Sequence, residues 1–493
     1  KKTEEPCNYV LNRPYFERDP DMYDFLASLL RSHGKSKALF QGQIVHAQIT
    51  SLGFDHITFI ANWVIEMYGN CGSMEEVEYV FAKIDYPNVF SFNILLKALG
   101  HNGWLDKAIK VFWAMPCWDI VSWNALIKAF SQWGRYNEAL DFYLQMLSKD
   151  VKPDKITFVS ILNVGSNLAS FEIGLEVHGS ILVHGFEVDI VIATSLVTLY
   201  GKCGRVVYAR TVFDRMTSQD IVSWNALIAG YAQNGLGHEA LKCVGQMRDT
   251  GVRLDVITYV CTLKACGIVG SLEMGSVIEI EVRKQGLLEK NVMVGNALVD
   301  MYSKCGALDK AREMFEQIPV KDVVSWSALI SGHAQLGHAN VVLNLYRRMV
   351  SKDVMPNLVT FVVLLSACSH AGLVKEGEKI FDEMFVYHLT PTLEHYTCLV
   401  DLFCRAGHFD KALAVIKAMP SSDYLAVWIA LLRACRKWGN VELGSLAFDQ
   451  TVQLDDSCIA AYVLMAAIYT AAGMIEDAET IEAMRPKVLL LRK

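Results

Sequence analysis

One nine-residue block occurs three times in the 493-residue chain and constrains its fold more than any other feature. The block reads Asp-Ile-Val-Ser-Trp-Asn-Ala-Leu-Ile from Asp119 and again from Asp220, and Asp-Val-Val-Ser-Trp-Ser-Ala-Leu-Ile from Asp322. Its tryptophans stand 101 and then 102 residues apart, at Trp123, Trp224 and Trp326. Such a period indicates that one structural cassette was copied along the chain. Stacked copies form an elongated body in which each unit contacts only its neighbours.

Each cassette divides into units of two helices. In the unit 221–255, Trp224, Leu227, Ile228 and Tyr231 follow the i, i+3, i+4, i+7 spacing of an amphipathic helix. The pair Asn-Gly at 234–235 breaks the chain before a second apolar stripe. One hairpin cannot bury both stripes, so neighbouring hairpins must stack. The sequence therefore predicts an all-α solenoid.

The same pattern divides most of the chain into units. We predict an N-terminal extension at 1–22 and two terminal units at 424–458 and 459–493. Between them we predict the repeat units 23–57, 58–88, 89–119, 120–154, 155–189, 190–220, 221–255, 256–291, 292–322, 323–357, 358–392 and 393–423.

Composition narrows the kind of partner. The net charge of −7 argues against a generally basic nucleic-acid coat, so any such site must be a local stripe. Many of the 13 cysteines recur at equivalent places, as in the Ala-Cys pairs ending at Cys266, Cys368 and Cys435, which indicates reduced packing residues. CxxC is absent, and we predict neither a metal site nor a cofactor. The uncharged run 457–475 coincides with a repeat-like helix, so we expect no membrane insertion.

Three kinds of motif alternate along the chain. They are Val-Ser-Trp-Asn-Ala-Leu-Ile at 121–127, Met-Tyr-Ser-Lys-Cys-Gly at 301–306, and Leu-Leu-Ser-Ala-Cys-Ser-His-Ala-Gly-Leu-Val at 364–374. In these motifs the chain resembles the PLS subclass of pentatricopeptide repeat proteins, where P, L and S units alternate. Residues 427–444 and 461–473 resemble the two E motifs of that subclass, whereas the tail after Met484 departs from the family pattern. The resemblance implies a right-handed superhelical solenoid that binds single-stranded RNA.

In this family the fifth and last residues of a unit face the edge of one base. Short polar side chains suit this task because they donate and accept hydrogen bonds at a defined place. Carried over to this chain, the base-reading pairs are Asn62/Asn88, Asn93/Asp119, Asn124/Asp154, Thr194/Asp220, Asn225/Asp255, Asn296/Asp322, Ser327/Asn357 and Thr397/Asp423.

A structural role competes with this interpretation, because Asp or Asn before a helix is often only a cap. The fifth residue lies inside the first helix, however, where Asn has poor helix propensity. We therefore favour base reading. The L units carry Val159, Val260 and Val362 in that slot, and we expect them to read little.

By the family's code the units read about Y-U-U-n-G-U-n-U-A-n-G, 5′ to 3′, with n at each L unit. The second residue of a unit is apolar or aromatic and is expected to wedge between bases. These base-stacking candidates are Phe59, Phe90, Val121, Val191, Val222, Met293 and Val324, and Glu394 breaks the series in the last S unit.

No catalytic motif accompanies the repeats. A zinc deaminase needs H-x-E and P-C-x-x-C, and neither occurs in the chain. We therefore expect a non-enzyme that lacks the DYW deaminase domain of many relatives. The expected function is site recognition in organellar C-to-U RNA editing, with a deaminase and accessory editing factors recruited in trans by the E motifs.

A structural subunit of a large organellar ribonucleoprotein, such as the mitochondrial ribosome, is the alternative to an editing factor. The family implies a mitochondrion or plastid. Because the chain starts at Lys1 without methionine, we expect a mature form from which the targeting peptide is absent.

Overall fold

A computed structural model describes residues 20–420 and 424–486. Within these ranges the secondary structure consists of 29 α-helices without a strand, which confirms the predicted all-α class. The chain divides into two compact units, Lys1–Arg253 and Leu254–Lys493, and each is described by itself. The predicted extension 1–22 lies largely, and the final residues 487–493 wholly, outside the described residues.

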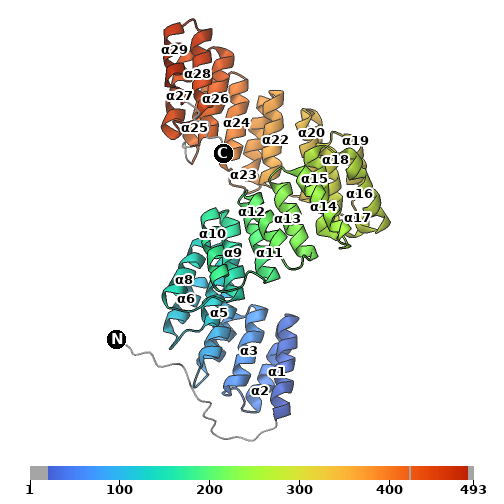
Figure 1. Ribbon diagram of the computed structural model, residues 1–493, viewed down its shortest axis with the longest axis vertical. Helices are drawn as coiled ribbons and strands as arrows, with labels where there is room; N and C mark the ends of the chain where they lie inside the picture. Colours follow the sequence, from blue (N-terminus) through green and yellow to red (C-terminus); the bar gives the residue numbers. More distant parts are fainter. Residues whose placement is uncertain (1–19, 421–423, 487–493) are drawn as a thin grey trace. The chain divides into compact units, whose positions relative to one another are not determined.

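Figure 1 shows hairpins of successive helices stacked side by side within each compact unit. The first compact unit contains α1 (Pro20–Lys35), α2 (Leu39–Ser51), α3 (Thr58–Cys71), α4 (Met74–Ala82), α5 (Val89–His101), α6 (Leu105–Ala114), α7 (Ile120–Gln132), α8 (Tyr136–Ser148), α9 (Lys155–Leu168), α10 (Phe171–Val183), α11 (Ile190–Lys202), α12 (Val206–Arg215), α13 (Ile221–Gln233) and α14 (Gly237–Asp249).

The second compact unit contains α15 (Val256–Val269), α16 (Leu272–Lys284), α17 (Leu287–Lys290), α18 (Val292–Lys304), α19 (Leu308–Gln317), α20 (Val323–Gln335), α21 (Ala339–Ser351), α22 (Leu358–Ala371), α23 (Val374–Val386), α24 (Leu393–Arg405), α25 (Phe409–Ala418), α26 (Leu425–Trp438), α27 (Val441–Leu454), α28 (Ile459–Ala471) and α29 (Ile475–Met484).

Each hairpin has a first helix, here called the A helix, and a second, the B helix. The A helices pack on one another in series, from α1 through the odd-numbered helices to α13, and from α15 through α18, α20, α22, α24 and α26 to α28. B helices also contact the next A helix, as α6 contacts α7 and α19 contacts α20. The A helices therefore form one continuous layer within each compact unit, and this layer carries the predicted site.

The residue before an A helix explains where that helix starts. Asp119, Asp154 and Asp322 each accept a hydrogen bond from the main-chain N–H three residues later, in a capping box. The break between A and B helices often falls on a glycine with positive φ, such as Gly235 at 74°. Only glycine adopts that backbone without strain.

The repeated tryptophan joins successive hairpins. Trp326 is 2% exposed, and its ring lies 4.8 Å from that of Phe315 at the end of the preceding B helix. Trp123 and Trp224 meet Phe112 and Phe213 in the same way, at 4.7 and 4.6 Å. The edge-to-face geometry is the favourable arrangement of aromatic pairs. The tryptophan of the repeated block therefore packs each hairpin against the preceding one.

The C-terminal hairpins continue the stack. One hydrophobic core runs from α24 and α25 through α26 to α29, and it includes Phe403, Trp428 and Tyr462. The run 457–475 forms α28 and the turn after it, and no helix in the described ranges is long and apolar enough to span a membrane. Burial raises the pKa of Cys266, as of Cys435, to about 11, as expected of packing residues.

Candidate nucleic-acid interface

The predicted fifth residues lie on the A helices, almost covered by their neighbours. Five of them are buried, with only 4 to 8% of their surface exposed, and these are Asn62, Asn93, Asn124, Asn225 and Asn296. Thr194, Ser327 and Thr397 are half-buried. Few atoms of such a buried side chain are accessible to a ligand. The hydrogen bonds that it makes with neighbouring residues therefore determine which donor or acceptor remains available for a base.

In the unit 89–119 the two predicted reading residues are hydrogen-bonded to each other. The Asn93 amide Nδ2 donates to both carboxylate oxygens of Asp119, at 3.1 and 3.2 Å. The Ser122 hydroxyl, in the next unit, donates to Asn93 Oδ1 at 2.8 Å and to Asp119 Oδ1 at 2.7 Å. We call this arrangement the Asn–Asp–hydroxyl triad.

Asn124 and Asn296 form the same triad with their own partners. Asn124 donates to Asp154 at 3.0 Å and accepts from Thr157 at 2.7 Å. Asn296 donates to Asp322 at 3.1 Å and accepts from Ser325 at 2.6 Å. The three hydroxyl residues were not among the sequence candidates. The pattern Asp-x-x-Ser/Thr at the start of a helix marks them as capping residues, but it also marks Ser223, whose hydroxyl donates to the Asp220 main-chain oxygen.

The triad orients the amide. An ionised carboxylate accepts only, so it faces Nδ2, and the hydroxyl donor then meets Oδ1. One N–H and one lone pair of the Asn remain for a ligand. Burial alone raises the pKa of Asp322, but hydrogen bonds from Ser325 and Asn296 outweigh it and hold the pKa below its usual value. The carboxylate therefore stays ionised at neutral pH.

The pair Ser327/Asn357 is linked differently. Ser327 Oγ lies 3.0 Å from Thr360 Oγ1, which donates to Asn357 Oδ1 at 3.0 Å, so the pair is joined through Thr360. In the unit 58–88, Ser91 donates its hydroxyl to Asn88, and Asn62 Oδ1 is buried without a hydrogen-bond partner in the described part of the chain.

In the threonine unit 190–220 the described residues show no such link. Ser223 donates its hydroxyl to the Asp220 main-chain oxygen at 2.8 Å, and the described residues contain no side-chain hydrogen bond between Thr194 and Asp220. The Thr397 hydroxyl donates to Leu393 O within its own helix, at 2.8 Å. Its predicted partner Asp423 lies outside the described residues.

The predicted last residues also cap helices, as the competing interpretation proposed. Asn88, Asp119, Asp154, Asp220, Asp255, Asp322 and Asn357 each accept a main-chain N–H at the start of the following A helix. Capping and base reading are compatible, because Asp119 and Asp322 cap a helix and hold an Asn at the same time.

The seven predicted base-stacking residues are all exposed, by 44 to 63%. Large apolar side chains in that state are available for contact with a ligand. The same second position is also exposed and apolar in the L units, at Ile156, Ile257 and Val359, which the sequence prediction left out.

Reading and stacking candidates meet in one groove of the second compact unit. Its lining includes the second residues Met293, Val324 and Val359 of three successive units. Asn296 and Ser327, the fifth residues of two of them, lie in the same lining, together with Asp322. The groove thus offers flat apolar contacts flanking polar groups, which suits a planar ring with a hydrogen-bonding edge.

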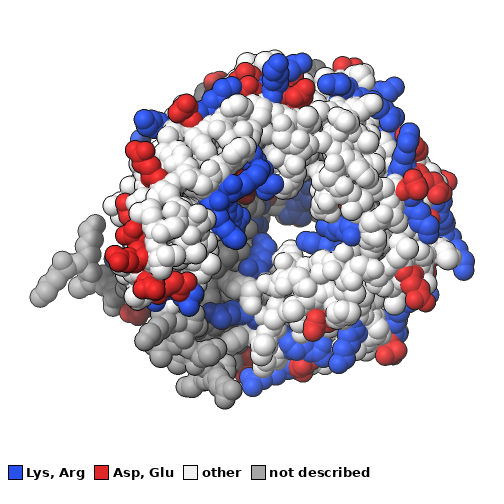
Figure 2. Space-filling view, turned by 90° about the horizontal axis from the view of Figure 1, so that it is seen from above, with Lys and Arg blue, Asp and Glu red and all other residues white. Residues whose placement is uncertain are grey.

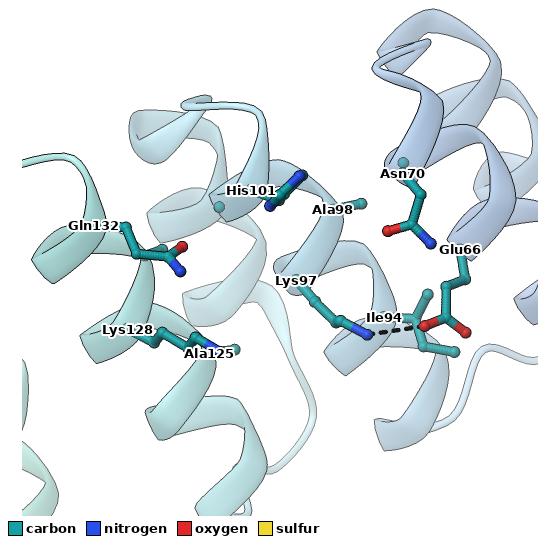
Figure 3. Close-up of a pocket in the computed structure, with 12 residues that line it drawn as sticks. Glu66, Asn70, Ile94, Lys97, Ala98, His101, Ala125, Lys128 and Gln132 are labelled. Atoms are coloured by element: carbon teal, nitrogen blue, oxygen red, sulfur yellow. Dashed lines mark hydrogen bonds and ion pairs between the residues drawn. The ribbon is translucent and has the colours of Figure 1, made fainter. Parts of the chain in front are cut away.

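A separate depression, of about 240 Å³, lies on the first compact unit, in the C-terminal halves of its A helices α3, α5 and α7. Figure 3 shows Glu66, Lys97 and Lys128 on α3, α5 and α7, with Lys97 donating to Glu66 at 2.8 Å. Asn70, His101 and Gln132 lie one turn on. Lys128 and the uncharged polar groups suit a phosphate backbone, whereas Glu66 neutralises Lys97 and would repel a phosphate.

The Lys and Arg residues do not form one continuous basic patch. Figure 2 shows Lys and Arg in separate clusters on a mostly uncharged surface. In the thirteenth place of the A helices from α3 to α24 no acidic residue occurs, and the residues there are Asn70, His101, Gln132, Asn167, Lys202, Gln233, Ile268, Lys304, Gln335, His370 and Arg405. Three of these residues are basic, so the expected basic stripe stays a prediction.

Known families and structures match this architecture. The chain matches the PPR repeat family over 118–164, 219–267 and 321–370, and a PPR repeat over 90–120, 191–221, 296–323, 359–387 and 387–420. The maize pentatricopeptide repeat protein PPR10 has a TM-score of 0.57 at 17% identity, covering 93% of this chain and 72% of PPR10. PPR10 in complex with an 18-nucleotide RNA element has a TM-score of 0.59 at 18% identity, covering 93% and 73%.

Three relatives from Arabidopsis thaliana are pentatricopeptide repeat-containing proteins. A mitochondrial one is 35% identical, covering 91% of this chain and 64% of the relative. A putative mitochondrial one is 32% identical, covering 90% and 69%, and a chloroplastic one is 39% identical, covering 94% and 63%. The chain thus spans 63 to 69% of the length of these relatives. Together, the repeated hairpins and these matches show that the chain belongs to the PPR repeat family.

Proposed function

We propose that this chain binds single-stranded RNA in a sequence-dependent manner, one nucleotide to a repeat. The groove that brings Met293, Val324 and Val359 together with Asn296 and Ser327 carries the proposal. Apolar side chains on successive repeats would hold a base between them, and the fifth residue would meet its edge. PPR10, whose fold is similar, has been solved with an RNA element.

The triads are compatible with the assignment of uracil to the Asn/Asp units. Uracil presents carbonyl acceptors beside an N–H donor. The N–H and the lone pair that remain on a fixed Asn amide complement such an edge. A donor beside an acceptor also occurs on the edges of the other bases, so the choice of U at Asn93, Asn124 and Asn296 rests on the family code.

Within this proposal the chain is a site-recognition factor for C-to-U editing in a plant organelle. It would belong to the PLS subclass, and the two hairpins from α26 to α29 would be its E motifs. They share a hydrophobic core with the last repeat. This packing would place a deaminase and accessory editing factors, recruited in trans by the E motifs, beside the 3′ end of the bound RNA. The names of the relatives, mitochondrial and chloroplastic, favour an organelle.

Base reading is tested by Asn124→Thr, which turns an Asn/Asp unit into a copy of the Thr194/Asp220 combination. The preferred nucleotide at that one register should change from U to G in a binding selection over an RNA library. Lys202→Ala, at an exposed site on another A helix, serves as the control and should weaken binding without changing the preferred sequence. An unaltered preference in Asn124→Thr would remove the reading assignment.

The editing role is tested separately by sedimentation of an organelle extract. An editing factor should sediment apart from ribosomes and crosslink to transcripts next to edited cytidines. Stoichiometric co-migration with ribosomal particles would instead support the structural subunit. Exposed apolar residues on B helices, such as Val183 at 83% and Val207 at 73%, are compatible with protein contacts in either case.

A further inference from the structure

We propose that three acidic residues on the A helices, Glu66, Asp300 and Asp401, weaken the binding of every RNA by occupying basic residues of the same helix face. The inference rests on the proposed RNA binding and deepens it, because it names residues that set the sequence-independent part of the affinity. Contacts with the bases would then supply most of the affinity that remains.

The first argument is the distribution of acidic residues. Counted from the first residue of each A helix, the ninth and thirteenth places lie one turn apart on one face. From α3 to α24 the thirteenth place holds no acidic residue, and the ninth holds only Glu66, Asp300 and Asp401. They lie on α3, α18 and α24.

The second argument is that each of these carboxylates contacts a basic residue of the same two places. One pair joins the neighbouring helices α3 and α5, and the other two join successive turns of one helix. The ion pairs are Glu66–Lys97 at 2.8 Å, Asp300–Lys304 at 2.7 Å and Asp401–Arg405 at 2.7 Å. The acidic residues of this face thus coincide with its basic ones.

The third argument is position. Asp300 lines the groove that also contains the reading candidates Asn296 and Ser327. Glu66 lines the depression of the first compact unit, beside Lys97 and Lys128, as Figure 3 shows. An RNA whose bases meet the fifth residues therefore passes these carboxylates one turn further along the same helices.

The fourth argument is electrostatic. The three carboxylate side chains are 26 to 35% exposed, and ion pairs so close to solvent contribute little to stability. A Lys or Arg in such a pair is already neutralised, so a phosphate gains little from it and must compete with the carboxylate. Because contacts with the RNA backbone carry no sequence information, this competition lowers the affinity for all RNAs alike.

The test uses the full chain with the carboxylates changed to amides, in Glu66→Gln, Asp300→Asn and Asp401→Asn, singly and together. An RNA of unrelated sequence should bind each single variant about two- to fivefold more tightly at low salt. In the triple variant the slope of log affinity against log salt should steepen by about 2, because each released cation adds about 0.7 for a single strand. The RNA that the family code predicts should gain by a similar factor, with an unchanged base preference opposite Asn296.

Two controls separate this mechanism from a change in net charge. Glu78→Gln removes the same charge from an ion pair with Lys107 between the B helices α4 and α6, and it should change the affinity by less than about twofold. In a Lys304→Gln background Asp300→Asn should lose most of its effect, because the cation that it would release is absent. Thermal unfolding identifies any variant that is misfolded, and the three single variants test the same effect independently.

Three results would overturn the inference alone. A lower affinity would mean that the carboxylates hold the cations in place for phosphates, and an unchanged affinity would mean that RNA does not approach the ninth place. An equal gain for Asp300→Asn with and without Lys304 would mean that the carboxylate acts by itself. In all three cases the unmodified chain still responds to a base change opposite Asn296. If it does not, or if it binds no RNA, the proposed function fails as well.

Discussion

The hydroxyl residue of the triad should control both stability and base preference, and Ser325→Ala tests this. The Ser325 side chain is fully buried. Its single O–H is shared between Asn296 Oδ1 at 2.6 Å and Asp322 Oδ1 at 2.9 Å, and its oxygen accepts the Asp322 main-chain N–H at 3.2 Å. Alanine removes all three bonds and leaves Asn296 Oδ1 buried without its donor.

The size of the effect follows from these contacts. A buried acceptor without a partner costs about 1–3 kcal/mol. Ser223 is the matched control, because it occupies the same place in α13 and is equally buried. Among the described residues its hydroxyl donates to the Asp220 main-chain oxygen alone, so Ser223→Ala should cost about 1 kcal/mol. The difference between the variants should be about 1–2 kcal/mol.

Both variants are assayed by thermal unfolding and by titration with RNAs that carry each base at the register of the mutated triad or pair. Ser325→Ala should lower the unfolding midpoint more, and should weaken the preference for U opposite Asn296 about three- to tenfold. Ser223→Ala should leave the preference at the Thr194 register unchanged. Equal losses of selectivity in the two variants would refute the role assigned to the hydroxyl.

Three further predictions concern the scaffold. The indole Nε1 of Trp326 is buried without an acceptor in the described residues, so Trp326→Phe loses no hydrogen bond. Measured by chemical denaturation, it should lower the free energy of unfolding by less than half of the roughly 3–5 kcal/mol expected for Trp326→Ala. Gly201→Ala would place a Cβ 3.0 Å from the Gly230 Cα, so the variant should be destabilised by about 1–3 kcal/mol, whereas an unchanged midpoint would mean that α11 and α13 separate freely. Burial lowers the pKa of His395 below 6.5, so the unfolded chain binds the proton first and stability should fall as pH drops through 6.5. This acid sensitivity, measured as the unfolding midpoint at pH 7.5 and 5.5, should diminish in His395→Asn.

The helical architecture was accessible from the sequence because its signals are local. Apolar spacing within a helix, an Asp at its start and a glycine after it all act within a few residues, and the all-α class is confirmed. The exposed second residues also followed from position alone. The second residues of the L units, Ile156, Ile257 and Val359, are exposed as well, and which of these positions stack on bases stays a prediction.

The triad could not be read from the sequence in the same way. Asn93 and Ser122 lie 29 residues apart and on different hairpins, and their contact depends on how two A helices pack. The same holds for Trp326 and Phe315, whose rings meet across a joint between repeats. Repetition of a residue in the sequence indicates that its position is important, but it does not identify the residue that it contacts on a neighbouring hairpin.

The sequence by itself therefore determined the repeat, its helices and the positions that vary between copies, since short-range periodicity and capping encode them. Only the tertiary structure decided which atoms of those positions remain available. Asn93, Asn124 and Asn296 have their amides oriented by an Asp of the same unit and a hydroxyl of the next. Asn62 carries the same side chain, yet its Oδ1 has no partner among the described residues. The physical reason is that a hydrogen bond between repeats exists only after the helices have stacked.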